Sequence, residues 1–175
     1  YLRGDSASAE FAGSFADTTR RPPSKVPTTT ALLTEVGRVV ADAGAHVENN
    51  AIYLVFTPKF LTGTKFCARH GAGTIDGHPV AVAYLPGLTS VDGCQVPDSS
   101  NGVPAAAQAM VNSLAHELLE IMTDSLIDDR TAWRDAVGQE VADKCAWQFQ
   151  RNARGYVTTR VGSYDWVLHP EWSND

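Results

Sequence analysis

The spacing of hydrophobic residues predicts a helix and two strands in the first half of the chain. After Thr28, apolar side chains recur on one helix face, and Gly44 stands where a C-terminal cap belongs. The helical positions are Leu32, Val36, Val39 and Val40. The unbroken apolar run 52–56 ends near a proline and is typical of a strand covered on both faces. A second run, 80–85, closes at Pro-Gly and predicts the next strand.

A longer helix is predicted from Pro104, because proline suits the first helical turn and the alanines that follow favour propagation. One apolar stripe runs along this helix: Ala107, Val111, Leu114, Leu118 and Met122. We expect the stripe to pack against the strands and the polar segment 116–120 to lie on the other side of the helix.

The remaining segments have weaker patterns. Residues 1–27 show no sustained period and contain several prolines, so we expect an irregular N-terminal arm. Residues 139–147 are compatible with a short helix, and the β-prone segment 156–172 with one or two strands or a packed tail. The prediction is an α+β fold in which residues 28–175 form a single domain, with a small β-sheet packed on a long helix.

Composition and charge narrow the class of protein. The chain has 175 residues, of which 43% are hydrophobic, which suits one domain with a substantial core. Its 14 basic residues are outnumbered by 20 acidic ones, and the net charge of -6 disfavours a partner bound through phosphate groups. No run of 18 apolar residues occurs. We therefore expect neither nucleic-acid binding nor membrane insertion.

The three cysteines permit one disulfide and leave one thiol. Cys67 and Cys94 both lie in glycine-rich loop sequence that flanks one predicted strand, so they are the expected pair, with Cys145 free. A disulfide would favour a secreted, extracellular protein. The alternative is three small buried side chains in a reducing cell.

The segment His116-Glu117-Leu118-Leu119-Glu120 carries the clearest chemical signal. Residues four apart on a helix have Cβ atoms about 5–6 Å apart, so His116 and Glu120 can reach one cation. Imidazole nitrogen and carboxylate oxygen are both good ligands for Zn²⁺. Glu117 takes the place of the general base in the His-Glu-x-x-His peptidases, while Glu120 replaces their second histidine. Alternatively, these residues lie on a solvated helix face, since glutamate is a strong helix former.

A third ligand is required, and Glu140 is the first candidate. It falls 20 residues after Glu120, a separation that resembles the glutamate ligand of gluzincin-type zinc peptidases. Asp143 is the alternative, either as a ligand or as a group that orients one. His70 can reach such a site from its loop, whereas His46, His78 and His169 are expected to be surface or core residues. The resemblance to these peptidases implies a zincin-like domain.

Several separated motifs resemble the exordium-like, or phosphate-induced, protein family, which has plant cell-wall members and bacterial relatives. The resemblance covers roughly residues 50–150 and implies an extracytoplasmic protein. It rests on the segments Ala115–Glu120 with Thr123-Asp124, Ala132-Trp133, Glu140–Cys145, Ile52–Thr57, Phe66-Cys67 and His70-Gly71.

Two functions follow from these observations. The first is a zinc-dependent hydrolase that acts on a polypeptide or a cell-wall-associated substrate, with His116, Glu120 and Glu140 as ligands and Glu117 as base. The second is a secreted binding or signalling module in which the acidic cluster holds a structural ion, Ca²⁺ in particular, because carboxylate oxygens suit hard cations. Glu120 favours the second, because a carboxylate ligand makes the metal less Lewis-acidic.

Overall fold

The computed structural model describes residues 8–97, 101–123 and 133–171. Within these ranges the elements combine helices with small sheets, so the predicted α+β class is confirmed. The helices are α1 (Thr29–Asp42), α2 (Ala105–Thr123) and a short 3₁₀ turn (Asp143–Cys145). The strands are β1 (Ala51–Phe56), β2 (Arg69–Ile75), β3 (His78–Leu85), β4 (Arg151–Asn152), β5 (Gly155–Tyr156), β6 (Thr159–Val161) and β7 (Tyr164–Trp166).

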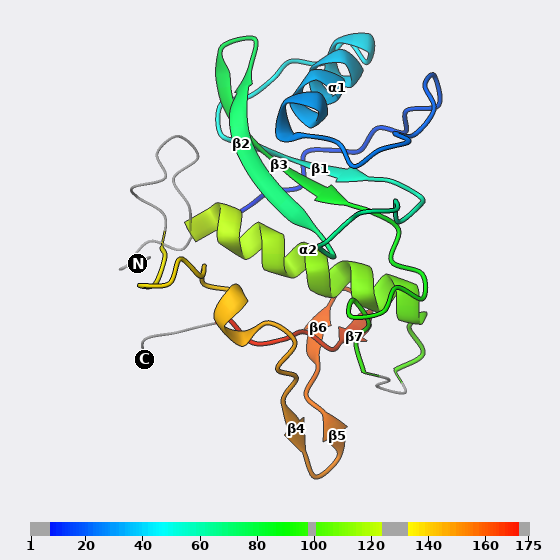
Figure 1. Cartoon of the computed structure of the whole chain (residues 1–175), viewed down its shortest axis with the longest axis vertical. Coiled ribbons are helices and arrows are strands. Elements are labelled where there is room, and N and C mark those ends of the chain that lie inside the picture. The colour runs from blue at the N-terminus through cyan, green and yellow to red at the C-terminus, as the bar shows by residue number, and fades with distance from the viewer. Residues whose placement is uncertain (1–7, 98–100, 124–132, 172–175) are drawn as a thin grey trace.

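The main sheet lies between the two long helices (Figure 1). Its strand order is β1-β3-β2, with β1 parallel and β2 antiparallel to the central strand β3. Side chains alternate along β3. Val80, Val82 and Tyr84 pack with α1, whereas Ala81, Ala83 and Leu85 pack with Ile121 of α2. The alanines leave room for α2 to approach the sheet closely.

The capping signals predicted for α1 are present. The side chain of Thr28 accepts a hydrogen bond from the amide of Ala31, and Gly44 has the positive φ of 66° that suits glycine after a helix. Residues 8–28, which precede the helix, contain no helix or strand. Arg38 of α1 pairs with Asp17 in this segment, which ties it to the domain.

Strand β2 was not predicted, because its sequence Arg-His-Gly-Ala-Gly-Thr-Ile reads as loop. Its glycines have a packing role. A Cβ on Gly71 would lie 2.8 Å from Oγ1 of Thr29, and one on Gly73 would lie 2.4 Å from Leu33. Both neighbours belong to α1, so the glycines let this helix lie directly on the edge strand.

The predicted apolar stripe of α2 is only partly correct. Leu114 packs against the sheet, but Val111 and Leu118 are half-buried, and the sheet-facing side also uses Met110 and Ile121. Glu117 and Glu120, expected on a polar outer side, are buried. The reason is that α2 is covered twice, by the sheet on one side and by the C-terminal region on the other (Figure 1).

Two amide side chains of α2 hold the C-terminal segment. The Gln108 amide donates to the carbonyl of Val167 at 2.8 Å and accepts from its N–H at 3.1 Å. One turn later, the Asn112 carbonyl accepts from the backbone N–H of His169 at 2.9 Å. The spacing Gln108, Asn112, His116 therefore presents one polar face to this tail.

Downstream of α2, the predicted strands are present, whereas the predicted short helix is reduced to a 3₁₀ turn. The helix expected at 139–147 is wrong, because only the 3₁₀ turn forms there and its backbone leaves the helical region at Ala146. The strands expected in 156–172 are present as β5 to β7 and are followed by a packed tail. Asp124 and Ala132, quoted for the family resemblance, lie outside the described residues. Neither α1 nor α2 combines the length and apolar composition that a bilayer crossing requires.

The predicted disulfide between Cys67 and Cys94 is confirmed, and Cys145 is a free thiol. The bond joins the segment before β2 to the loop after β3 across 27 residues of sequence. We expect the double variant Cys67→Ser/Cys94→Ser to lose about 3 kcal/mol of unfolding free energy, because the unfolded chain regains loop entropy. Urea denaturation measures the loss, with Cys145→Ser as the matched control. An unchanged midpoint for the double variant would contradict this role.

Candidate metal centre

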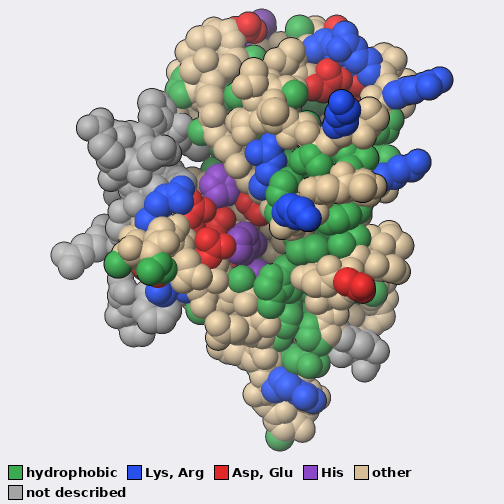
Figure 2. All heavy atoms as spheres, viewed as in Figure 1, with side chains coloured by type: hydrophobic (Ala, Val, Ile, Leu, Met, Phe, Trp, Pro, Cys, Tyr) green, Lys and Arg blue, Asp and Glu red, His purple; other side chains and the backbone are tan. Residues whose placement is uncertain are grey.

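Histidines and carboxylates from four parts of the chain meet beside α2. His116, Glu117 and Glu120 come from α2, and His70 comes from β2. Glu140 and Asp143 come from the segment around the 3₁₀ turn, and His169 from the C-terminal tail. The space-filling view shows acidic and histidine side chains gathered in the middle of one face (Figure 2).

Three ligand atoms converge in a group that we call the triad: His116, Glu120 and Asp143. Nε2 of His116 lies 3.3 Å from Oε1 of Glu120 and 3.6 Å from Oδ1 of Asp143. With bonds of about 2.0–2.2 Å to nitrogen and oxygen, two ligands of a tetrahedral zinc ion lie roughly 3.3–3.6 Å apart. The separations therefore match those of a zinc site.

The contact between His116 and Glu120 is not a hydrogen bond. Oε1 of Glu120 is buried and, among the described residues, has no hydrogen-bond partner, although Nε2 of His116 is only 3.3 Å away. An unpartnered buried carboxylate oxygen is costly. Both atoms instead face a common point, as two ligands of one cation do.

His70 lies among three carboxylates. Its Nδ1 is 2.9 Å from Oε2 of Glu117 and 3.5 Å from Oε2 of Glu120, and its Nε2 is 3.6 Å from Oε2 of Glu140. An imidazole with a carboxylate at each nitrogen satisfies both only as a doubly protonated cation. His70, Glu117 and Glu120 also form a second group whose ligand atoms lie within 4.8 Å of one another.

Glu140, the first candidate for the third ligand, lies in the same cluster, where its side chain raises the pKa of Glu120. Its carboxylate pairs with Arg134 and faces His70, and its backbone amide donates to Oδ2 of Asp143 at 3.2 Å. The structure thus brings Asp143 to His116, while Glu140 lies at the His70 side of the cluster.

The concentration of negative charge acts on Glu120. Burial, together with the charges of Glu140, Glu117 and Asp143, raises its pKa to about 10. Burial also lowers the pKa of His116, although the neighbouring carboxylates oppose this shift. Without a cation, Glu120 therefore keeps a proton at neutral pH.

The hydrogen bonds of His169 determine which nitrogen of His116 faces the triad. Asn112 accepts from the backbone of His169, so its NH₂ group faces Nδ1 of the same residue at 3.1 Å, and Nδ1 must accept. Burial lowers the pKa of His169 to about 4, so the ring is neutral and carries its proton on Nε2. That proton points to Nδ1 of His116 at 3.2 Å. Because Nδ1 of His116 accepts this bond, the neutral His116 ring carries its own proton on Nε2 in the metal-free protein. Binding of a cation at Nε2 would require this proton to move to Nδ1 and the hydrogen bond with His169 to be rearranged.

A cleft of about 530 Å³ adjoins the triad. His116, Glu117 and Asp143 line one part of it, and the segments 60–68 and 91–94 line another. A substrate in the cleft would therefore touch both the proposed ligands and the proposed base. Clefts of about 300–1,000 Å³ are typical of small-molecule and substrate sites.

The sequence pointed to all of the acidic members of this site but to only part of its histidines. His70 was considered as a loop residue, and its position next to the cysteine of a glycine-rich segment was the available signal. His169 was expected at the surface or in the core. It is buried, and it contacts His116. No local pattern marks it, because the contact spans 53 residues. His46 is exposed, and His78 contacts Asn49.

Comparisons with protein-family models, with curated protein sequences and with solved structures gave no match.

Proposed function

We propose that the chain is a zinc-dependent hydrolase that cleaves polypeptide, with His116, Glu120 and Asp143 as the protein ligands. The observation that carries the proposal is the convergence of these ligand atoms at the edge of the cleft, with Glu117 beside them. Three protein ligands leave a fourth position open, which is the arrangement of a catalytic rather than a structural zinc site. Asp143 replaces Glu140 as third ligand in this proposal because it lies next to His116.

Glu117 is suited to act as general base. It lies one residue after His116 on α2, lines the cleft and is not needed for the triad. The ion would supply Lewis acidity, which makes a coordinated water acidic near neutral pH. Glu117 would accept the proton of that water, and His70, 2.9 Å from Oε2, would hold the carboxylate in position.

A zincin-like fold and a relation to the exordium-like family are part of this proposal. A small sheet packs on the motif-bearing helix, and an acidic ligand follows the helix in the sequence, as in zinc-peptidase domains. The disulfide supports an extracellular location, because such bonds persist in oxidising compartments. The resemblance to the exordium-like family favours a cell-wall-associated substrate.

A structural calcium site is the second candidate. Four carboxylates, from Glu117, Glu120, Glu140 and Asp143, surround the histidines, and oxygen ligands suit Ca²⁺. In this case the chain would be a secreted binding module. The imidazole nitrogen of His116 in the triad favours zinc over calcium, since nitrogen is a poor ligand for hard cations.

Metal analysis of the purified protein tests the proposal. We expect about one equivalent of zinc, and we expect His116→Ala to weaken zinc binding beyond the roughly 10–100-fold that losing a supporting hydrogen bond causes. Hydrolysis of an unfolded polypeptide should be lost with the zinc. His78→Ala is the matched control, because this histidine contacts Asn49 and lies in neither ligand group. Calcium alone, or zinc that is retained in His116→Ala, would contradict the assignment.

A further inference from the structure

Much of the cleft beside the triad is apolar. Away from the proposed ligands, the lining includes Phe60, Phe66, Val91 and Trp147. Figure 2 shows the same contrast, with a hydrophobic area directly beside the acidic and histidine cluster. A substrate that reaches the triad through this cleft therefore contacts apolar and aromatic side chains on the way.

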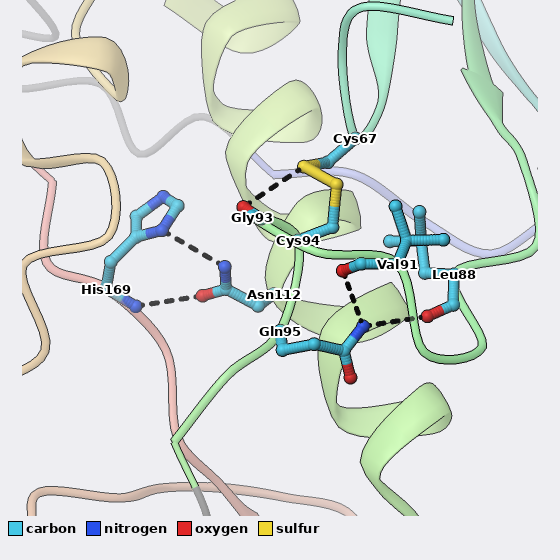
Figure 3. The surroundings of a disulfide bond; sticks show 8 residues. All are labelled: Cys67, Leu88, Val91, Gly93, Cys94, Gln95, Asn112 and His169. Carbon is cyan, nitrogen blue, oxygen red and sulfur yellow. Dashed lines mark hydrogen bonds between the residues drawn. A yellow bond between two sulfur atoms is a disulfide. The ribbon is translucent and has the colours of Figure 1, made fainter.

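The walls of the cleft are fixed before any substrate arrives. The disulfide joins Cys67 to Cys94, so the segment that carries Phe66 is bonded covalently to the loop that carries Val91 (Figure 3). The side-chain amide of Gln95 donates to the carbonyls of Leu88 and Val91 at 2.9 and 3.1 Å, which closes this loop on itself. A preformed cleft loses little conformational entropy when a ligand binds.

Trp147 is held at the cleft in an unfavourable backbone conformation. Its φ of 63° lies in the left-handed region, which is rare for a bulky residue. Its indole ring packs edge-on against Phe149 and His169 yet stays 38% exposed. Burial alone does not explain this arrangement, because the ring remains open to solvent at the cleft. Strained residues of this kind concentrate at binding and catalytic sites.

The charges around the cleft exclude several substrate classes. Four carboxylates lie in or beside the triad, whereas Lys65 is the one lysine among the lining residues. Together with the net charge of -6, these carboxylates disfavour phosphate groups and acidic side chains. A neutral, bulky side chain with its flanking backbone is compatible with both the lining and the 530 Å³ volume.

On the basis of the proposed hydrolase function, we propose that this cleft binds a bulky apolar side chain, aromatic or leucine-like, next to the peptide bond that is cleaved. The apolar walls select the side chain, and the adjoining triad receives the carbonyl group of the bond. Specificity then depends on Trp147 and the phenylalanines and is separable from metal binding.

Binding of small amino-acid amides to the zinc-loaded protein tests the cleft without requiring turnover. We expect N-acetyl-phenylalaninamide to bind at least ~10-fold more tightly than N-acetyl-alaninamide, as expected for the loss of several buried carbons, and N-acetyl-glutamate amide not to bind. Changes in NMR chemical shifts report the affinities. Trp147→Gly should reduce the phenylalanine preference to about twofold and keep its zinc, since glycine adopts the backbone conformation of Trp147 readily.

Tyr164→Ala is the matched control, because it removes an exposed aromatic ring from β7, outside the cleft. It should leave the preference unchanged. Equal binding of the three amides, or a preference that survives in Trp147→Gly, would overturn the proposal. Mapping of cleavage sites in an unfolded protein gives the second readout, and sites without a bulky apolar neighbour would also overturn it. A phenylalanine preference without any hydrolysis would contradict the hydrolase but keep the cleft as the apolar binding site.

Discussion

Hydrolysis of unfolded polypeptide is expected to fall by at least about 100-fold in Glu117→Gln, because a positioned general base typically contributes about 10²–10⁴ in rate. Glutamine has the size of glutamate and keeps a carbonyl oxygen for the hydrogen bond from His70. Zinc content and melting temperature should therefore stay close to those of the wild type. Turnover and metal content are measured on the same preparation.

Glu48→Gln is the control for this experiment, since Glu48 is exposed and lies outside the ligand groups. If Glu117→Gln removes the zinc, Glu117 is a ligand and not a base. If neither the wild type nor the variants cleave polypeptide while zinc stays bound, the binding-module function replaces the hydrolase.

Glu120→Gln is expected to have opposite effects on the metal-free and the zinc-loaded protein. In the folded metal-free protein Glu120 keeps its proton up to about pH 10, whereas in the unfolded chain it loses the proton near its ordinary value of 4.5. The folded state therefore binds more protons between these values, and its stability falls as pH rises. Between pH 8 and 9 we expect a loss of about 1 kcal/mol per pH unit in the wild type and none in Glu120→Gln.

A window from pH 8 to 9 separates Glu120 from two other shifted groups. Burial raises the pKa of Glu171 to about 7 and lowers that of His169 to about 4, so both groups are almost fully deprotonated by pH 8. With zinc present, the wild type is expected to be the more stable of the two proteins. The ion should stabilise the wild type by about 4 kcal/mol at 1,000 times its dissociation constant, and Glu120→Gln hardly at all.

Thermal unfolding with and without zinc measures both effects, and about 4 kcal/mol corresponds to roughly 8–16 °C for a chain of this size. A metal-free wild type whose melting temperature is flat from pH 8 to 9 would contradict the buried, protonated Glu120. Zinc stabilisation that persists in Glu120→Gln would remove this residue from the ligand set.

The sequence predicted the elements whose pattern is local. The spacing of Leu32, Val36 and Val40 predicted α1, and the apolar runs predicted β1 and β3, because each of these elements buries side chains at its own period. Strand β2 was missed because Gly71 and Gly73 are selected by the close approach of α1, which no local pattern shows. The burial of the motif side of α2 was missed for the same kind of reason, since its cover comes from β2, the segment 140–143 and the tail, all distant in sequence.

The candidate site likewise combines residues that a local sequence pattern predicts with residues that only distant contacts bring in. His116, Glu117 and Glu120 follow from helical spacing alone. The position of Asp143 relative to Glu140 depends on the backbone between them, and the helix expected there would have put both on one face. The 3₁₀ turn instead directs Asp143 to His116 and Glu140 to His70. His169 joins the site only because Asn112 binds its backbone across 57 residues.

The pairing of Asn112 with His169 also has a consequence for the order in which the site is completed during synthesis. The ligand residues of α2 and the 3₁₀ turn are synthesised before residues 165–169. Until the tail emerges, Gln108 and Asn112 have no backbone to bind, and His116 lacks the neighbour that directs its Nε2 toward the triad. A nascent chain would therefore build its sheet first and complete the proposed metal site late, after the tail has docked on α2.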